Sequence, residues 1–408
     1  MNILFLTLDR FLNVNDREIS EDLMRKFKQE GHDVYVVCPR ERSFKMPTCL
    51  NEQGGIHILG VKTLNMQKSS ILEKGVGTLL IEGQFKRAIK RYLSGICFDL
   101  VLYTTPPITF TRVIAYVKKC NPNAKAYLLL KDIFPQNAVD IGMFSKRSLF
   151  WLYFRRKEKA LYYVSDFIGC MSPANVNYVL AHNDFINPAI VEVAPNSIEL
   201  AEQVQLSLKD KIEMRKRYNL PLDKPILIYG GNLGKPQGVP FLIECLNANK
   251  NRDDCHFLVI GSGTEYGKLE EWYKKNCPKA VSLYKRLPKN DYDKLVQCCD
   301  IGLIFLDYRF TIPNFPSRLL SYLEYKMPVI CATDLCCDMG PIVTKNGFGI
   351  WVPSNNVKAF TTSVDSILKH NIQQMGEKAY EFLKSNYTVD NTYNAIIKHF
   401  VSLAPHNV

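Results

Sequence analysis

Long hydrophobic runs are missing from this sequence. No apolar stretch reaches the roughly 18 residues that a membrane-spanning helix needs, and the segment from Met1 to Asp9 lacks the basic lead and the cleavage site of a signal peptide. The 408 residues are 47% hydrophobic and 23% charged, which is typical of a globular protein. We therefore expect a cytoplasmic chain with room for two domains, although length alone also allows a single barrel.

Patterns that bind metals or form disulfides are also missing. The 13 cysteines include no Cys-x-x-Cys pair, and the adjacent cysteines at 298–299 and 336–337 do not have the spacing of a zinc site. Others, such as Cys38 and Cys331, lie in apolar runs, where a free cysteine behaves as a small hydrophobic residue. We expect reduced thiols, no metal site and no cofactor.

Nucleic-acid-binding signatures are absent as well, although the chain is basic. Its formal net charge is +12, and residues 86–159 hold 15 lysines and arginines against four acidic residues. Such a cluster can bind anionic lipid headgroups, a phosphorylated substrate or nucleic acid, but no zinc finger or RNA-binding motif accompanies it. Ordinary solvated helix faces explain the cluster equally well. We expect no nucleic-acid partner.

Strand-like and helix-like segments alternate in the first 200 residues. Short apolar runs predict strands at 2–8, 33–38, 56–61, 100–103, 126–130, 167–171 and 190–193, and amphipathic spacing predicts helices at 19–30, 79–93 and 110–119. This alternation favours a mostly parallel sheet with helices on both faces. Residues 1–200 are therefore expected to form a doubly wound domain.

The second half repeats this alternation. Strands are predicted at 225–229, 256–260, 281–284, 301–306 and 329–332, and helices at 239–247, 268–275 and 292–298. We expect a second doubly wound domain over 201–387, and a helix at about 388–408 is a candidate to pack back on the first domain. Two such domains in tandem leave a cleft between them, lined by loops at the carboxyl ends of the strands.

Three turns that suit an anion follow strands of the second domain. A Gly-rich segment at 230–238 contains Lys235, Gly261-Ser262-Gly263 follows the next strand, and a helix is expected to start at Ser317-Arg318. Glycines let a ligand approach the backbone, and cations, hydroxyls and helix N–H groups bind phosphate. Alternatively, Ser317 only caps its helix and Arg318 is solvated. The coincidence of three such turns at one sheet edge favours an anion site.

The order of these motifs resembles that of glycosyltransferases with the GT-B fold, in particular the retaining enzymes of family 4. The likeness covers nearly the whole chain and extends to bacterial enzymes that build capsule, O-antigen or colanic-acid-like polysaccharides, such as N-acetyl-L-fucosamine transferases. It implies an α/β protein of the GT-B fold, in which two doubly wound Rossmann-like domains face an interdomain cleft. The segments that carry the resemblance are 131–138, 169–173, 195–197, 231–238 and 314–322.

The resemblance implies a nucleotide-sugar site in the second domain. Lys235 and Arg318 would stabilise the negative charge that develops on the departing diphosphate, so no metal would be required. The nucleotide base would lie near the glycines of the second turn and the strand exit at 285–288. The residues implied to bind the nucleotide sugar are Gly231, Asn232, Gly234, Gln237, Gly261, Ser262, Gly263, Arg286, Leu287, Phe315, Pro316, Ser317, Leu319, Ser321 and Glu324.

Two positions depart from the family pattern. Ser321 occupies the place of a glutamate that usually contacts the ribose, and Gln237 occupies the place where many members carry the phosphate lysine. Glu324 lies about one helical turn beyond Ser321 and is a candidate substitute for the ribose contact. Its alternative is an ordinary solvated helix glutamate.

Acceptor-side residues are expected in the first domain. Asp132 follows a predicted strand and is a candidate catalytic group that orients or deprotonates the acceptor hydroxyl, although an aspartate before a Pro-containing loop is as often a turn residue. Asp16, Arg17 and Lys131 are the further acceptor-binding candidates.

A membrane contact is a further expectation. The implied acceptor is an undecaprenyl-diphosphate-linked saccharide, and the basic helices around Lys86 to Arg91 and Arg155 to Lys159, with the apolar neighbours at 150–154, suit peripheral contact with an anionic inner membrane face.

Together these observations favour a retaining glycosyltransferase. It would move a hexose, an N-acetylhexosamine or a 6-deoxyhexosamine from a nucleotide diphosphate sugar, with UDP as the expected nucleotide, to a lipid-linked saccharide. Two other function classes remain open. A non-hydrolysing UDP-sugar 2-epimerase shares the architecture but needs a set of carboxylates and histidines that the seven histidines do not suggest. A non-catalytic basic sugar- or nucleic-acid-binding protein would bind without turnover and with strong salt dependence.

Overall fold

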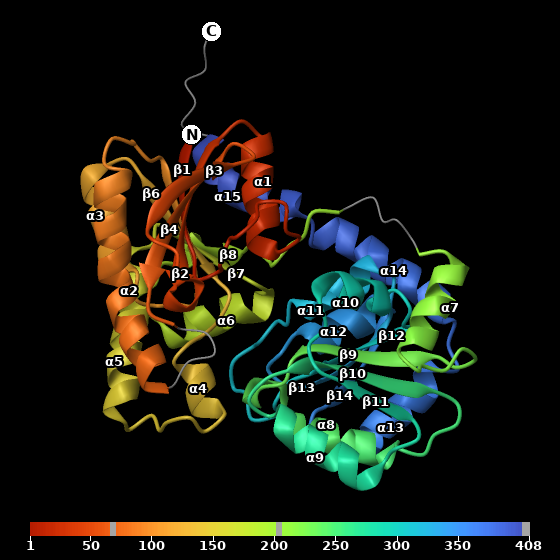
Figure 1. The fold of residues 1–408 in the computed structure, drawn as a ribbon. Helices are drawn as coiled ribbons and strands as arrows, with labels where there is room; N and C mark the ends of the chain where they lie inside the picture. The colour runs from red at the N-terminus through yellow and green to blue at the C-terminus, as the bar shows by residue number, and fades with distance from the viewer. Residues whose placement is uncertain (66–70, 201–205, 402–408) are drawn as a thin grey trace. The chain divides into compact units, whose positions relative to one another are not determined.

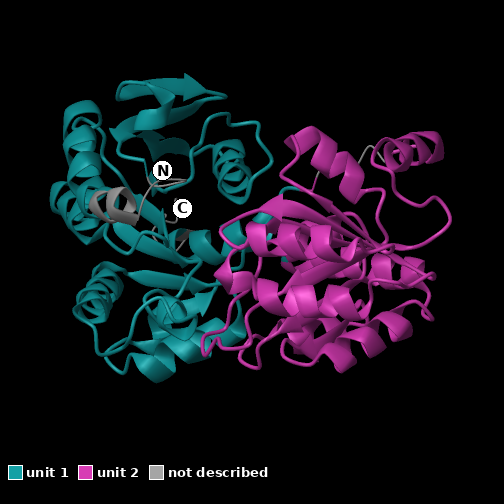
Figure 2. Ribbon diagram, turned by 60° about the horizontal axis from the view of Figure 1, so that its bottom comes forward, with its two compact units in different colours: residues 1–199, 387–408 teal, residues 200–386 magenta. Residues whose placement is uncertain are grey.

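The chain folds into two compact units. The computed structural model describes residues 1–65, 71–200 and 206–401. The first unit comprises residues 1–199 together with 387–408, and the second comprises residues 200–386 (Figure 2). Each unit contains one sheet with helices on both of its faces (Figure 1). The prediction of two doubly wound α/β sheets is confirmed.

The first unit contains an eight-stranded sheet in the order β3-β4-β2-β1-β5-β6-β7-β8, in which only the β3–β4 pair is antiparallel. Edge strand β3, which the sequence analysis missed, is mostly exposed and polar. The strands are β1 (Asn2–Leu6), β2 (Asp33–Glu41), β3 (Cys49–Gln53), β4 (Ile56–Thr63), β5 (Leu100–Thr104), β6 (Lys125–Leu130), β7 (Phe167–Cys170) and β8 (Val191–Val193). The helices are α1 (Ile19–Gln29), α2 (Ile71–Tyr92), α3 (Thr111–Cys120), α4 (Gln136–Asp140), α5 (Leu149–Val164), α6 (Pro173–His182) and α15 (Val389–Val401).

Apolar side chains from alternate strand positions fill the two faces of this sheet. Ile3 and Phe5 of β1 pack with Phe27 of α1 and with Ile396 and Phe400 of α15, so the C-terminal helix completes the core of the first unit. Helices α2 and α3 pack side by side, and α3 contacts α5. Since both faces are covered, the strands are continuous apolar runs, which is why the sequence located them well.

The second unit contains a six-stranded sheet, parallel throughout, in the order β11-β10-β9-β12-β13-β14. Its strands are β9 (Ile226–Asn232), β10 (His256–Ser262), β11 (Val281–Tyr284), β12 (Ile301–Phe305), β13 (Val329–Thr333) and β14 (Gly349–Pro353). Its helices are α7 (Leu208–Arg217), η3 (Lys235–Gln237), α8 (Val239–Ala248), α9 (Tyr266–Asn276), α10 (Lys289–Val296), α11 (Arg318–Glu324), α12 (Met339–Lys345), α13 (Val357–Ile367) and α14 (Ile372–Asn386).

The strand order places a ligand site in this second sheet. From β9 the chain moves outward through β10 and β11, and then returns to the other side of β9 with β12. In parallel α/β sheets, ligands bind outside the carboxyl ends of the strands at such a reversal. The loops after β9 and β12 are therefore the first place to look for a binding site. In Figure 1, α8 and α9 lie on one side of this sheet and α10 and α11 on the other.

Candidate functional site

The Gly-rich segment after β9 forms a tight turn held from within. Gly231 has φ +123°, a value that favours glycine. The Gln237 side-chain oxygen accepts hydrogen bonds from the Asn232 amide and from the Gly234 N–H, each 3.1 Å long. Gln237 therefore orders the turn, and its amide oxygen is already engaged. This is a structural role that the sequence analysis did not foresee.

The second glycine turn packs directly on the first. The Leu233 N–H donates to the Ser262 carbonyl (3.0 Å), and the Glu265 N–H donates to the Leu233 carbonyl (2.9 Å). A Cβ atom on Gly261 would lie 2.1 Å from the Gly231 carbonyl oxygen, and one on Gly263 would lie 2.4 Å from the Leu233 carbonyl oxygen. These two glycines are needed because backbone meets backbone.

The exit of β12 joins the same cluster. The Asp307 N–H donates to the Pro236 carbonyl (2.9 Å), which ties η3 to the end of β12. The buried Asp307 carboxylate in turn accepts two hydrogen bonds from Arg309, 2.8 and 2.7 Å long. The structure therefore brings the loops after β9, β10 and β12 together.

Arg318 lies at this cluster and is only partly exposed. Its guanidinium carbon lies 4.4 Å from the centre of the Tyr229 ring, and a Cβ atom on Gly231 would lie 3.3 Å from its Nη2 atom. Its Nη1 atom is buried and has no hydrogen-bond partner among the described residues. The alternative of a solvent-exposed arginine is wrong. A buried guanidinium N–H group without an acceptor suits an anionic ligand.

The start of α11 differs from the anion site that the sequence predicted there. Ser317 is exposed, has helical backbone angles and makes no capping hydrogen bond with its side chain. The Leu319 and Leu320 N–H groups donate to the Pro316 and Ser317 carbonyls, so part of the first turn of α11 is closed internally. The expected convergence of several free helix N–H groups is therefore wrong in part, and the Arg318 side chain is the main candidate of this segment for binding an anion.

The other residues predicted to bind the nucleotide sugar differ in their exposure. Lys235 and Ser262 are exposed at their turns, and Arg286 is exposed after edge strand β11, with Leu287 partly covered beside it. Leu319 is fully buried in the core, so its side chain cannot reach a ligand. On the same segment, Pro316 and Ser321 are partly exposed, and Phe315 and Glu324 are buried. The alternative of a solvated Glu324 is wrong, and its ribose contact stays a prediction.

Tyrosines are the residues of this site that the sequence analysis missed. The Tyr229 hydroxyl donates to the Asn232 carbonyl (2.6 Å), and the Tyr322 hydroxyl accepts from the Gly230 N–H (3.2 Å). Tyr292 of α10 also lies against Gly230. Two of these tyrosines could have been found from their places in the sequence. Tyr229 is the last apolar residue before the glycines, and Tyr322 follows Arg318 by one helical turn.

An Asp-x-Asp sequence, a spacing that can bind metals, was also overlooked. Asp291 and Asp293 flank Tyr292 on α10, where residues two apart point to different sides of the helix. Asp291 accepts hydrogen bonds from Arg217 Nη2 and the Tyr218 hydroxyl, each 3.3 Å long. Across the described ranges, no group of three or more His, Cys, Asp or Glu side chains has a metal-binding arrangement.

All 13 cysteines are free thiols. Cys38 and Cys331 are buried, as expected, whereas four others are exposed: Cys97, Cys120, Cys277 and Cys336.

In the first unit, Asp132 sits in an ordered turn after β6. Its carboxylate accepts a 2.6 Å hydrogen bond from the Asn137 amide, and its N–H donates to the Thr105 hydroxyl (3.1 Å). Burial raises the pKa of Asp132 to about 6, although the Asn137 amide and the Ile133 N–H act in the opposite direction. The turn role is present, and a role in proton transfer stays a prediction.

Lys131 lies beside two acidic residues that were not predicted. Burial lowers the pKa of the Lys131 ammonium, while the neighbouring Asp9 and Glu21 act to raise it. Burial also raises the pKa of Glu21 to about 7, and Asp9 adds to this effect. Asp9 follows β1, Lys131 follows β6 and Glu21 lies in the first turn of α1, so these three charged groups are near enough to act on one another.

Arg17 and Asp16, the other two acceptor candidates, take part in hydrogen bonds with main-chain carbonyls. Arg17 Nη2 donates to the Glu199 carbonyl (3.0 Å), and the exposed Asp16 accepts through its carbonyl from Arg25 Nη1 (2.9 Å). Arg25 also binds the Glu199 carboxylate at 2.9 Å. These contacts fix the chain at Glu199, and acceptor binding by the exposed Arg17 and Asp16 stays a prediction.

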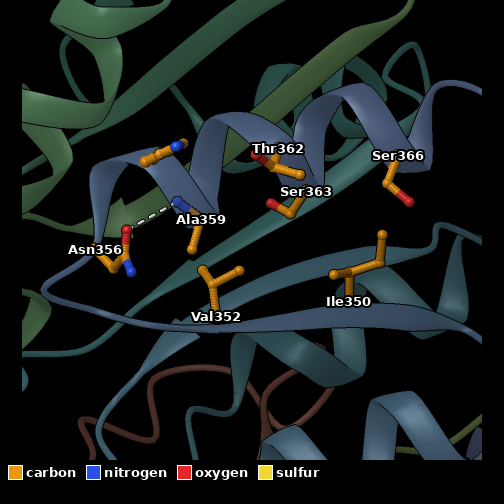
Figure 3. Close-up of a pocket in the computed structure, with 8 residues that line it drawn as sticks. Ile350, Val352, Asn356, Ala359, Thr362, Ser363 and Ser366 are labelled. Atoms are coloured by element: carbon orange, nitrogen blue, oxygen red, sulfur yellow. Dashed lines mark hydrogen bonds between the residues drawn. The ribbon is translucent and has the colours of Figure 1, made fainter.

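An open hollow of about 490 Å³ lies away from the glycine turns, between β14 and α13 (Figure 3). Its floor is formed by Ile350 and Val352, and hydroxyls of α13 line the opposite wall; Asn356 accepts from the Ala359 N–H at 2.9 Å, as the dashed line shows. Since β14 is the edge strand two positions from β12, this hollow is not at the point where the strand order reverses. It has no cluster of cations to bind a diphosphate.

The basic region is only partly as expected. Lys86, Arg87, Lys90 and Arg91 are exposed on α2. Arg155 is occupied, because its guanidinium binds Glu158 (2.6 Å), the His182 carbonyl (2.9 Å) and Asn183 (2.7 Å). Across the part of the chain that the structure describes, no helix is both long enough and apolar enough to cross a membrane.

A cluster of exposed apolar and basic side chains surrounds the start of α5. Leu149 and Phe150 are 82% and 68% exposed. Trp151 and Phe154, which were expected to join them, are partly buried, and Phe154 packs against Phe134. We call the exposed set the α5 surface: Met143, Lys146, Arg147, Leu149, Phe150, Leu152, Tyr153 and Arg156.

Comparisons with known proteins agree with this architecture. Residues 180–382 match the family model described as "Glycosyl transferases group 1". The chain is 21% identical over 298 residues to "Probable glycosyltransferase WbjE" of Pseudomonas aeruginosa, covering 72% of this chain and 70% of the relative. It is 25% identical over 185 residues to "Putative colanic acid biosynthesis glycosyl transferase WcaI" of Escherichia coli K12, covering 43% and 44%.

The solved structure of Anabaena Alr3699/HepE in complex with UDP and glucose has the same fold. It superposes with a TM-score of 0.70 at 14% identity and covers 98% of this chain and all of the other chain. The GT-B fold predicted from the sequence is therefore confirmed, as is the prediction of an enzyme that transfers a sugar. The fold and these matches, the family model among them over residues 180–382, identify this chain as a glycosyltransferase with the GT-B fold.

Proposed function

We propose that this enzyme transfers a hexose, an N-acetylhexosamine or a 6-deoxyhexosamine from a UDP-sugar, with retention of configuration, to a lipid-linked saccharide. The observation that carries the proposal is Arg318: a guanidinium with a buried, unpartnered Nη1 atom beside the glycine turns of β9 and β10. UDP as the nucleotide is supported by the complex of the Anabaena protein of the same fold. A role in polysaccharide synthesis is supported by the name of the Escherichia coli relative.

The proposed chemistry follows from the charge at this site. As the bond between the anomeric carbon and the β-phosphate oxygen breaks, negative charge grows on the departing diphosphate, and the acceptor oxygen bonds to the anomeric carbon. The departing diphosphate takes the acceptor proton. A cation already fixed beside the leaving group stabilises this charge without reorganisation. In this proposal Arg318 and the mobile, exposed Lys235 supply the positive charge, so no metal ion is needed.

In this proposal the acceptor binds to the first unit. Asp132 would orient the acceptor hydroxyl, and Lys131 with Asp9 and Glu21 would bind neighbouring hydroxyls of the saccharide. Carboxylates and an ammonium are suited to this role because each sugar hydroxyl both donates and accepts hydrogen bonds.

Turnover with a donor panel tests the proposal. The purified chain is incubated with UDP-, GDP- and dTDP-linked hexoses and N-acetylhexosamines, with and without an undecaprenyl-diphosphate-linked saccharide, and free nucleoside diphosphate is measured. We expect release from a UDP-sugar that depends on the acceptor. A changed donor sugar without net release would indicate an epimerase instead. Silence across all donors in the presence of the acceptor would contradict the proposal.

We also propose that the α5 surface rests on an anionic membrane, where a lipid-linked acceptor is found. Its exposed apolar side chains suit the interface, and Lys146, Arg147 and Arg156 suit anionic headgroups. Because Arg155 is occupied by protein partners, it is left out of this surface.

Charge reversal tests the membrane contact. The triple variant Lys146→Glu, Arg147→Glu, Arg156→Glu should bind anionic phosphatidylglycerol vesicles at least about tenfold more weakly in sedimentation, since each basic residue near such a surface contributes about 1 kcal/mol. The matched control reverses Lys209, Lys216 and Arg217, which are exposed on α7 of the other unit. Equal loss in both variants, or no loss in either, would rule out a specific role of the α5 surface.

A further inference from the structure

The two strands on either side of the point where the strand order reverses pair over a short distance. The pairing of β9 with β12 begins at Leu227 and Ile301 and ends one residue later, at Ile228 and Gly302. By contrast, β9 pairs with β10 along its whole length. Gly230, which lies beyond the point where β9 and β12 part, is buried. Buried backbone N–H and C=O groups are costly to leave without a partner, so the backbone at this opening needs a partner other than a strand.

The phenol of Tyr322, which comes from α11, supplies that partner. Its hydroxyl accepts a hydrogen bond from the Gly230 N–H (3.2 Å) and donates to the Ile228 carbonyl (3.1 Å). The Leu303 carbonyl of β12 is a second acceptor, 3.4 Å from the same hydroxyl. Burial raises the pKa of Tyr322, so the hydroxyl keeps the proton that it donates. One side chain therefore joins β9 to β12 where their backbones no longer pair.

Gly302 of β12 leaves room for this ring. A Cβ atom on Gly302 would lie 2.3 Å from Cδ2 of Tyr322 and 2.5 Å from its Cγ. A glycine inside a strand weakens the strand and often marks a close approach of another group. Here that group is the fully buried Tyr322 ring. Packing on Gly302 therefore fixes the ring, and the ring fixes the position of its hydroxyl.

Helix α11 reaches the first glycine turn at a second point. Arg318 lies one helical turn before Tyr322, and its Nη2 atom would lie 3.3 Å from a Cβ atom on Gly231. Tyr322 binds the preceding residue, Gly230. With seven residues, α11 is too short to be stable alone, so contacts with the rest of the unit must hold it. The anchor at Tyr322 therefore sets where Arg318 and the turn lie relative to each other.

We propose that Tyr322 is a positioning residue: its hydroxyl bridges β9 and β12 and holds the Gly230-Gly231 turn in the position that binds the diphosphate of the donor. The inference rests on the proposed function and deepens it, because it names what sets the shape of the diphosphate site. A ligand enters an α/β sheet at the reversal because the chain leaves a crevice there. The phenol satisfies the backbone groups that this crevice would otherwise leave unpaired.

Removing the hydroxyl tests the role of Tyr322. Tyr322→Phe keeps the ring against Gly302 but takes the acceptor away from the Gly230 N–H. The Kd of UDP for the whole chain is measured by calorimetry, and KM and kcat are measured with the UDP-sugar that the donor panel identifies. We expect Kd and KM to rise about tenfold and kcat to stay within about threefold, because the turn binds the diphosphate before transfer as well as during it. A smaller number of folded molecules would instead lower kcat and leave KM unchanged.

Hydrogen exchange and two further variants separate positioning from a general loss of stability. Without any ligand, the Gly230 amide should exchange faster in Tyr322→Phe than in the wild type. Gly302→Ala, which displaces the ring, should also raise the Kd of UDP. Tyr103→Phe is the matched control, because it removes a fully buried hydroxyl that is bonded to Ser165 (2.5 Å) in the first unit; it should leave the Kd unchanged. Thermal unfolding identifies any variant that fails to fold.

Each outcome decides between the two hypotheses. If Tyr322→Phe binds UDP as tightly as the wild type, or if Tyr103→Phe loses as much affinity, the positioning role is wrong while the donor site stands. Unchanged exchange of the Gly230 amide would also overturn the positioning role, since the hydroxyl would then not hold the turn. If the wild-type chain binds neither UDP nor GDP nor dTDP, the donor site is wrong and the positioning role falls with it.

Discussion

Replacing Arg318 with alanine should lower kcat by roughly 100- to 1,000-fold, the effect of removing one fixed group that stabilises developing charge. The reason is that Arg318 lies beside the glycine turns with a buried, unpartnered Nη1 atom, so its charge is available to the leaving diphosphate. The loss should appear in kcat more than in KM, since negative charge on the diphosphate is greatest in the transition state. The measurement is the initial rate of acceptor-dependent UDP release at saturating donor.

Two companion variants interpret this result. Arg318→Lys keeps the charge but loses the planar fork, so it should recover only part of the rate. Arg252→Ala is the matched control. Arg252 precedes the amino end of β10, whereas the glycine turns follow the carboxyl ends of the strands, and it is paired with Asp254 and Asp365. It should stay within about twofold of the wild type. A normal kcat in Arg318→Ala would show that Arg318 does not act on the leaving group.

Replacing Gly261 with alanine should abolish UDP binding and destabilise the second unit. The added Cβ atom would meet the Gly231 carbonyl oxygen at 2.1 Å, and since both groups are backbone, neither can rotate away. The ends of β9 and β10 would have to separate, which breaks the hydrogen bond from the Leu233 N–H to the Ser262 carbonyl. We expect at least about a 100-fold loss of UDP affinity and a fall in the free energy of unfolding of about 2 kcal/mol, as for other overpacked sites.

Gly267→Ala is the control for this prediction. Gly267 lies four residues downstream of the second turn on α9, and no atom lies within 4 Å of the position of its Cβ atom. Gly267 is the second residue of α9, and helices favour alanine over glycine by up to about 0.5–1 kcal/mol, so this variant should be at least as stable as the wild type and bind UDP normally. Calorimetry and thermal unfolding of both variants provide the comparison. If Gly261→Ala bound UDP as tightly as the wild type, the two turns would not form the nucleotide site.

The sheets could be predicted from the sequence because their strands are buried on both faces. Segments such as Ile301–Phe305 and Val329–Thr333 are continuous apolar runs, and runs of this kind are recognisable without knowledge of their neighbours. The edge strand β3 was missed for the opposite reason, since its residues are polar and mostly exposed. Its place in the sheet depends on β4, which no local pattern reveals.

The site could be predicted only in its local parts. The glycine turns and Arg318 were visible because each is a short motif after a strand. The ring of Tyr292 was not, because it comes from helix α10 and packs against Gly230 only in the folded unit. Likewise, Gln237 had been expected to bind the nucleotide sugar, but its side-chain oxygen accepts hydrogen bonds from Asn232 and Gly234. Hydrogen bonds that close a turn compete with ligand contacts for the same atoms, and the sequence does not show which of the two prevails.

The same limit applies to charged residues on helices and loops. Arg17 had been expected at an acceptor and Arg155 at a membrane, and the guanidinium of each binds a backbone carbonyl of the first unit. An arginine has five N–H donors and can bind several acceptors at once. An arginine that looks like a ligand-binding residue in the sequence therefore often stabilises the fold. Neighbours such as Arg147 and Arg156 remain exposed, and the α5 surface depends on them.

The central claim is that a nucleotide diphosphate binds at the turns of β9 and β10 beside Arg318. A crystal structure of the protein with UDP tests it most directly. We predict that a phosphate oxygen will lie within hydrogen-bond distance of Arg318 Nη1, with the two glycine turns beside the diphosphate. The claim would be contradicted if UDP bound elsewhere in the second unit, for example in the hollow between β14 and α13, while the guanidinium of Arg318 kept no phosphate contact.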